Sequence, residues 1–99
     1  MVTYEVTLDV VPEHAGRLDA YMLDKHIGEV VATGCFNAAT YFRDGHRRKT
    51  VYEAPDQVSL NRYLDEFAAK LRDDFVEHFP SGVTPSRDVW TAICRFEAP

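Results

Sequence analysis

The feature that most constrains the fold of this chain is its hydrophobic pattern, in which a segment with the period of a strand is followed by one with the period of a helix. Apolar and polar side chains alternate from Val2 to Val10, and a period of two predicts a strand with one buried face. Pro12 ends that strand, because proline lacks the N–H that a central ladder uses. From residue 13 to residue 31 apolar side chains recur about every four residues, which predicts a helix. That helix is expected to end near Thr33-Gly34, where glycine can take the left-handed cap conformation.

The rest of the chain repeats this order with one more strand. Residues 35–43 and 49–53 are rich in aromatic and β-branched residues, and Asp44-Gly45 between them is a hairpin turn signal. Asp56 is a suitable N-cap for a second helix, and residues 87–96 predict the last strand. The apolar stripe of the second helix consists of Leu60, Leu64, Phe67, Leu71 and Phe75.

The element order β-α-β-β-α-β predicts a single α+β domain over residues 1–99, a ferredoxin-like sandwich with sheet order 4-1-3-2 and both helices on one face. This arrangement puts Cys35 and Cys94 on opposite edge strands, roughly 14 Å apart. A disulfide needs Cα atoms within about 7 Å, so the cysteines are expected to remain thiols and to serve as small buried hydrophobes.

Helices can cover only one face of such a sheet. On the last predicted strand Val89 and Ile93 have one parity, and Trp90 and Phe96 have the other. Because both faces of this edge strand are apolar, a second cover is expected. The sequence therefore predicts a homodimer in which two sheets pack together.

Composition and charge exclude several classes of partner. The formal net charge is −5, which argues against nonspecific binding to nucleic acid or an anionic membrane. The basic run of residues 46–49 falls on a hairpin tip, where charge is usually solvated, and residues 48–53 lack the glycine and paired aromatics of an RNA-recognition strand. No apolar run has membrane-spanning length and the start resembles no signal peptide, so a cytoplasmic location is expected.

The string from Asp24 to Phe36, DKHIGEVVATGCF, resembles the central signature of a bacterial family of about one hundred residues that is known as a domain of unknown function. Tyr63-Leu64, Leu71-Arg72 and the run Arg87 to Trp90 resemble its later landmarks. Such proteins are similar to the dimeric α/β-barrel superfamily, which includes small cofactor-independent monooxygenases, haem-degrading enzymes and isomerases. The resemblance implies a pocket between sheet and helices, but no particular reaction.

His26 is the leading candidate site residue, as a general base or ligand-orienting group at the mouth of that pocket. The alternative is a half-buried histidine of the apolar stripe with satisfied ring nitrogens. A position near the helix C-terminus is expected to raise its pKa. Tyr41 and Arg87 are the candidate ligand-binding residues, because each has a polar tip on an edge strand, where a planar anion could be clamped. Arg87 could instead pair with Glu53.

No cofactor fingerprint is present, and the four histidines show no i, i+3 or i, i+4 pair, so neither a cofactor nor a metal is predicted. Two functional hypotheses remain open. The first is a small-molecule-binding dimeric α/β barrel, which includes the case of a cofactor-independent enzyme acting on an apolar or aromatic metabolite. The second is a non-catalytic homodimeric assembly or regulatory module. An open pocket at His26 favours the first, and a packed interior there favours the second.

Overall fold

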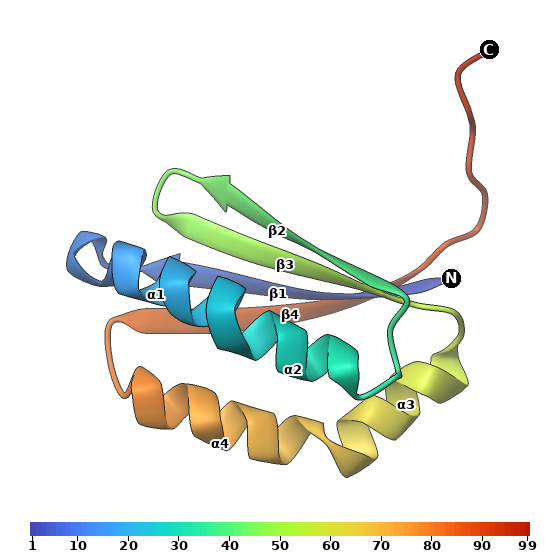
Figure 1. Ribbon diagram of the computed structural model, residues 1–99. Coiled ribbons are helices and arrows are strands. Elements are labelled where there is room, and N and C mark those ends of the chain that lie inside the picture. Colours follow the sequence, from blue (N-terminus) through green and yellow to red (C-terminus); the bar gives the residue numbers. More distant parts are fainter.

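A computed structural model describes all residues of the chain, 1–99, as four strands and several helical segments (Figure 1). In chain order they are β1 (Val2–Val10), the short 3₁₀ turn η1 (Pro12–His14), α1 (Ala15–Tyr21), the π-helical turn η2 (Met22–His26), α2 (Ile27–Ala32), β2 (Ala38–Asp44), β3 (Arg47–Ala54), α3 (Gln57–Glu66), α4 (Ala68–His78) and β4 (Val83–Thr91).

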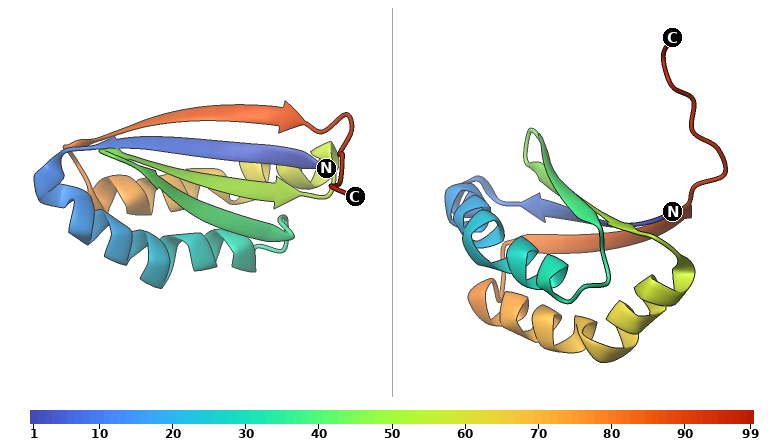
Figure 2. Two further views of the ribbon diagram at one scale, coloured as in Figure 1. Left: turned by 90° about the horizontal axis from the view of Figure 1, so that it is seen from above. Right: turned by 45° about the vertical axis from the view of Figure 1, so that its right-hand side comes forward.

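The strands form one antiparallel sheet in the order β2-β3-β1-β4. This is the predicted 4-1-3-2 arrangement read from the other edge, so the ferredoxin-like fold is confirmed. All helices lie on one face of the sheet, which Figure 2 shows from above. The register places Tyr4 opposite Tyr52 on β3 and Val89 on β4, and this row faces the helices.

Alternation along β1 determines which face of the sheet is buried. Val2, Tyr4, Leu8 and Val10 are buried under the helices, whereas Asp9 is exposed. The first helix follows its predicted stripe, with Leu18, Met22 and Val30 among the most buried residues of the chain. It runs without interruption through α1, η2 and α2 to Ala32, and Gly34 follows two residues later with a φ of 80°. That positive φ is favourable for glycine and costly for other residues.

The second predicted helix is two helices that meet at Phe67 (Figure 1). The Asp56 side chain caps the first of them by accepting a hydrogen bond from the N–H of Ser59, at 2.8 Å. Tyr63 at the end of α3 and Ala68 at the start of α4 are both buried. The bend lets each helix turn its own apolar face toward the sheet, which a straight stripe does not predict.

Three strands differ in their bounds from the prediction, and β3 differs least, being Arg47–Ala54 rather than 49–53. The second strand begins at Ala38 rather than at residue 35, and the last strand is Val83–Thr91 rather than 87–96. β4 follows the full length of β1, pairing Val83 with Val10 and Thr91 with Val2, so it ends opposite the first residue of its antiparallel partner. Pro85 is compatible with β4 because this strand is an edge.

These boundaries change the surroundings of the cysteines. Both are free, but neither lies in a strand. Cys35 is buried in the loop before β2, as expected of a small hydrophobe. Cys94 is exposed in the segment after β4, so the expectation that it is buried was wrong.

The basic run also differs from the prediction. Arg47 is exposed, but Arg48 is only 6% exposed and lies on the helix-facing side of β3. The Arg48 guanidinium pairs with Asp19 of α1. The interpretation of the whole run as a solvated hairpin tip was therefore wrong for Arg48, because alternation along β3 turns this residue inward.

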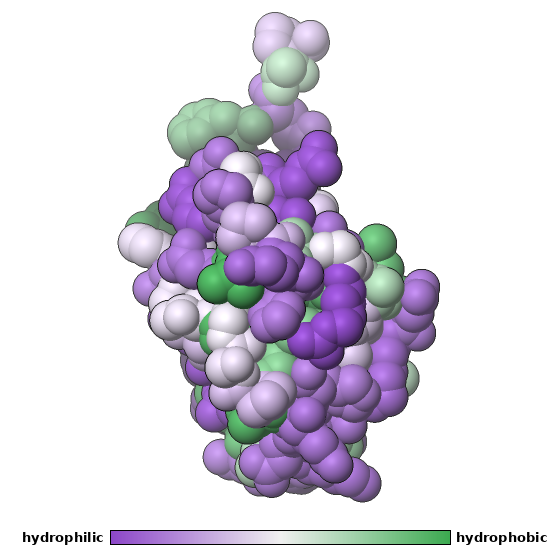
Figure 3. Space-filling model, turned by 90° about the vertical axis from the view of Figure 1, so that its left-hand side faces the viewer, coloured by the Kyte–Doolittle hydropathy of each residue, from purple (hydrophilic) through white to green (hydrophobic).

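Hydrophobic side chains are spread unevenly over the surface. Figure 3 shows one end of the molecule, where hydrophilic residues predominate and hydrophobic residues appear in small patches. Large exposed apolar side chains include Trp90 on β4 and, beyond that strand, Ile93 and Phe96. No helix is long and apolar enough to cross a membrane.

Candidate functional site

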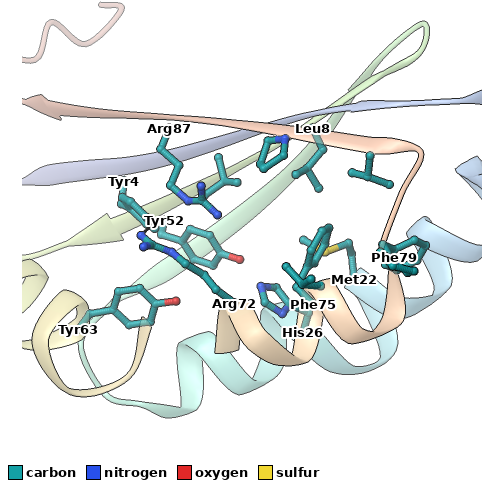
Figure 4. A pocket seen from close by; sticks show the side chains of 15 residues that line it. Tyr4, Leu8, Met22, His26, Tyr52, Tyr63, Arg72, Phe75, Phe79 and Arg87 are labelled. Carbon is teal, nitrogen blue, oxygen red and sulfur yellow. Dashed lines mark hydrogen bonds between the residues drawn. The ribbon is translucent and has the colours of Figure 1, made fainter. Parts of the chain in front are cut away.

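A cavity of about 190 Å³ lies between the helix-facing side of the sheet and the helices (Figure 4). Ten of its 15 lining residues are hydrophobic. They include Val6 and Leu8 from β1, Met22 from η2, Phe75 from α4, and Phe79, which directly follows α4. A mostly apolar hollow with a few polar groups is the usual form of a small-molecule site.

His26 borders this cavity and is half-buried, as the first hypothesis requires. Its Nδ1 lies 3.4 Å from the hydroxyl of Tyr21, a long hydrogen bond. The Tyr21 hydroxyl donates its one proton to Oδ2 of Asp74, at 2.7 Å. Nδ1 of neutral His26 must then donate to Tyr21, which leaves Nε2 as the acceptor nitrogen. No group of the protein hydrogen-bonds to Nε2.

The protonation of His26 follows from its burial. Burial lowers the pKa of His26, the carboxylates of Glu29 and Asp74 raise it, and Lys25 and Arg87 lower it further, with a net decrease. The predicted increase from a helix C-terminus was wrong, because burial has the largest effect on this pKa and lowers it. At neutral pH the ring is therefore uncharged and can accept a proton.

Asp74 is held as a carboxylate beside this histidine. Its Oδ2 lies 2.7 Å from the ammonium of Lys25, and this hydrogen bond together with that from Tyr21 lowers the pKa of Asp74. Burial and the neighbouring Asp74 raise the pKa of Tyr21 far above its usual value. Tyr21 therefore remains a phenol and links the carboxylate to the imidazole.

Two guanidinium groups reach the same cavity from opposite sides (Figure 4). Arg87 extends from β4 in the row of Val6, so it lies on the helix-facing side of the sheet. Arg72 extends from α4, and its Nη2 donates to the Tyr4 hydroxyl at 3.0 Å. Neither forms an ion pair, and Glu53 lies on the opposite side of the sheet in the row of Thr3. The alternative pairing of Arg87 with Glu53 is thus not formed.

Phenol groups complete the polar lining. The hydroxyls of Tyr52 and Tyr63 project toward the cavity in Figure 4. Burial raises the pKa of Tyr63 to about 12 and that of Tyr52 further. Both side chains are thus neutral at physiological pH and can donate a hydrogen bond to a bound molecule.

Tyr41 lies apart from this site. Its hydroxyl donates to Oδ1 of Asp19 at 2.8 Å, and Asp19 also accepts hydrogen bonds from Nε and Nη2 of Arg48 at 2.8 and 3.2 Å. Tyr41 borders a separate shallow depression beside α1. The structure thus brings His26 and Arg87 to one cavity and leaves Tyr41 outside it.

Sequence reasoning missed Arg72, although a signal for it was present. Arg72 has i, i+3, i+4 and i+7 spacing with Phe75, Val76 and Phe79, and all four side chains line the cavity. This stripe describes α4 better than a stripe continued from the preceding helix. No group of three or more His, Cys, Asp or Glu side chains is arranged to hold a metal ion.

Comparisons with known proteins agree with this architecture. Residues 1–93 match a family model described as a domain of unknown function, DUF4286. No curated protein sequence matches the chain.

Three solved structures share the fold. One, from Deinococcus radiodurans and provisionally assigned as an antibiotic biosynthesis monooxygenase, has a TM-score of 0.73 at 16% identity and covers 99% of this chain and 98% of its own. Rv0793 from Mycobacterium tuberculosis has a TM-score of 0.67 at 14% identity, with 97% and 98% covered. A third, an antibiotic biosynthesis monooxygenase, has a TM-score of 0.64 at 15% identity, with 95% and 100% covered. At such identities the likeness shows the fold alone.

Proposed function

For this chain, which belongs to the domain-of-unknown-function family DUF4286, we propose that the cavity between sheet and helices binds a small apolar or aromatic molecule. The observation that carries this proposal is the combination of an apolar lining with polar groups that converge on one space. His26, Arg87 and Tyr63 come from three different elements, and all three line this cavity. A packed interior would have supported the hypothesis of a purely structural module.

His26 orients the bound molecule or removes a proton from it. Its acceptor nitrogen Nε2 has no partner in the protein, and the low pKa caused by burial keeps the ring neutral. Tyr21 holds the ring in this tautomer, and Asp74 holds Tyr21. A general base needs these three properties: an available lone pair, a suitable pKa and a fixed orientation. Cofactor-independent turnover would use Nε2 as the proton acceptor.

Binding can be tested with a neutral aromatic probe, 2-naphthamide, by proton–nitrogen correlation NMR of the labelled protein. We expect saturable shifts of amides around the cavity and of the imidazole resonances of His26. The exposed His46, in the turn between β2 and β3, is the internal control and should not shift. Shifts that never saturate, or that are spread over the whole surface, would contradict a small-molecule site.

The role of His26 can be separated from its contribution to stability. His26→Gln keeps hydrogen-bonding capacity at similar size, so we expect weaker probe binding with little change in melting temperature. His46→Gln should change neither. If His26 were only a core residue, the substitution would cost about 1–3 kcal/mol of stability through a poorly satisfied polar group, with no separate effect on binding.

A homodimer joined sheet to sheet is the second part of the proposal. The face of the sheet opposite the helices carries Phe42, Val51 and Trp90, of which Trp90 is 63% exposed. Val89, on the other side of β4, is also exposed at 47%. Exposed apolar side chains on one sheet face favour a protein partner, and a second copy of the chain would cover them.

Light scattering at micromolar concentration should give twice the chain mass of 11.3 kDa. Trp90→Asp should shift the protein toward the monomer, because an unpaired charge in a buried interface is strongly unfavourable. Val58→Asp is the matched control, since Val58 is also an exposed apolar residue but lies on α3. A wild-type protein that remains monomeric would contradict the dimer.

A further inference from the structure

The charged residues around the cavity are all of one sign. Its lining contains the positively charged Arg72 and Arg87 and the neutral imidazole of His26, but neither aspartate nor glutamate. The whole chain, in contrast, has 16 acidic against 11 basic side chains. The cavity lining is therefore positively charged, although the chain as a whole is negatively charged.

The two arginines are not occupied by ion pairs within the protein. Four other arginines pair with carboxylates: Arg47, Arg48, Arg62 and Arg95. The only side-chain hydrogen bond of Arg72 is to the hydroxyl of Tyr4, and Arg87 forms no side-chain hydrogen bond. Unpaired guanidinium groups beside an apolar hollow are suited to a ligand that brings its own negative charge.

The guanidinium groups of Arg72 and Arg87 also both influence the phenol of Tyr63. The positive charges of Arg72 and Arg87 both lower the pKa of the Tyr63 phenol, against the larger effect of burial. All three side chains line the same cavity, and Figure 4 shows the Tyr63 hydroxyl projecting toward it. This hydroxyl is an additional donor for an oxyanion placed between the arginines.

We propose that the ligand is a planar ring-bearing carboxylate whose carboxylate group lies between Arg72 and Arg87 and whose ring lies against the apolar wall formed by Phe75 and Phe79. This inference rests on the proposed binding function and adds the chemical class of the ligand. A guanidinium matches the planar, two-oxygen geometry of a carboxylate. Tyr4 holds Arg72 in place from β1, and Tyr63 donates a further hydrogen bond.

The test compares two probes that differ in charge but hardly in shape, 2-naphthoate and 2-naphthamide, by calorimetric or NMR titration of the intact protein. Hydrogen bonds to charged groups stabilise a complex more than neutral ones do, so we expect 2-naphthoate to bind about tenfold more tightly or better. Arg72→Gln and Arg87→Gln should each remove most of this preference. Both arginines are exposed at the cavity rim, so neither substitution should disturb folding.

Arg43→Gln is the matched control, because Arg43 is also exposed and forms no ion pair but lies on β2 away from the cavity. It should keep the full preference for 2-naphthoate. A preference that survives in Arg72→Gln and Arg87→Gln, or that Arg43→Gln also abolishes, would overturn the assignment. Tighter binding of 2-naphthyl phosphate than of 2-naphthoate would overturn the choice of a carboxylate.

The same titration separates this inference from the proposed function. Equal affinity for 2-naphthoate and 2-naphthamide would refute the anionic ligand and leave the small-molecule site standing. Binding of neither probe would refute both. Tight, arginine-dependent binding of 2-naphthoate would support both.

Discussion

Removing the carboxylate of Asp19 tests how the ion pair with Arg48 holds α1 against the sheet. The contact is bidentate, at 2.8 and 3.2 Å, and Tyr41 donates a further hydrogen bond to the same carboxylate. In Asp19→Ala the Arg48 guanidinium, which is only 6% exposed, keeps two carbonyl partners, those of Gly45 and Arg47, but has no counter-charge. Breaking a buried pair costs about 3–5 kcal/mol.

The expected loss is somewhat smaller than this, because the Asp19 side chain is 33% exposed and water can partly solvate the guanidinium after the substitution. We therefore expect about 2–3 kcal/mol, which corresponds to a decrease in melting temperature of roughly 10–20 °C for a domain of this size. Urea unfolding followed by circular dichroism measures the loss as a change in midpoint at constant slope.

Asp44→Ala is the control, because Asp44 pairs with Arg47 on the same hairpin but both side chains are more than half exposed. A surface pair of this kind contributes about 0–1 kcal/mol. If Asp19→Ala were no more destabilising than Asp44→Ala, the buried pair would not stabilise the fold and the reasoning would be refuted. Binding of 2-naphthoate should be unchanged in folded Asp19→Ala protein, since Asp19 lies outside the cavity.

Three further predictions concern pH, thiol reactivity and a turn. Burial lowers the pKa of His26 below 6.5, so the contribution of this residue to stability is complete above that pH and is lost as the pH falls toward the folded-state pKa. His26→Gln should therefore flatten the decrease in unfolding free energy between about pH 7 and pH 5. An unchanged slope would contradict this. In native protein a thiol reagent should modify Cys94 at once and Cys35 only upon unfolding, so two fast thiols would show that Cys35 is not buried. Gly82 has a φ of 83°, and a Cβ atom at this position would meet the His14 ring. Gly82→Ala should therefore lower the free energy of unfolding by about 2 kcal/mol or more in chemical denaturation. Gly16 lies on α1 with open space around it, so Gly16→Ala should be neutral or stabilising.

Much of the fold could be predicted because its signals are local. Alternation along Val2–Val10, the stripe of the first helix and the Asp44-Gly45 turn depend on residues within a few positions of one another. Once these elements were placed in order, the handedness of crossovers left one main sheet arrangement. His26 could be nominated for the same reason, since its place on the stripe is a local property.

Strand ends and cavity membership depend on residues distant in sequence. β4 begins and ends where β1 offers a partner, and β1 is more than seventy residues away in the chain. The pKa of His26 is decided by burial and by charges on other elements rather than by its own helix. Arg48 is a similar case. Alternation along β3 turns its side chain inward, but its partner Asp19 comes from α1 and is set by the packing of that helix on the sheet.

The sequence by itself determined the order of strands and helical regions and the buried faces of β1 and of the first helix, because hydrophobic periodicity is a property of the local chain. Only the tertiary structure decided that Arg72 joins Arg87 and His26 at one cavity while Tyr41 pairs with Asp19 elsewhere. The physical reason is that a side chain's partner is set by packing between elements, and the bend at Phe67 and the pairing of β4 with β1 determine which side chains share a space.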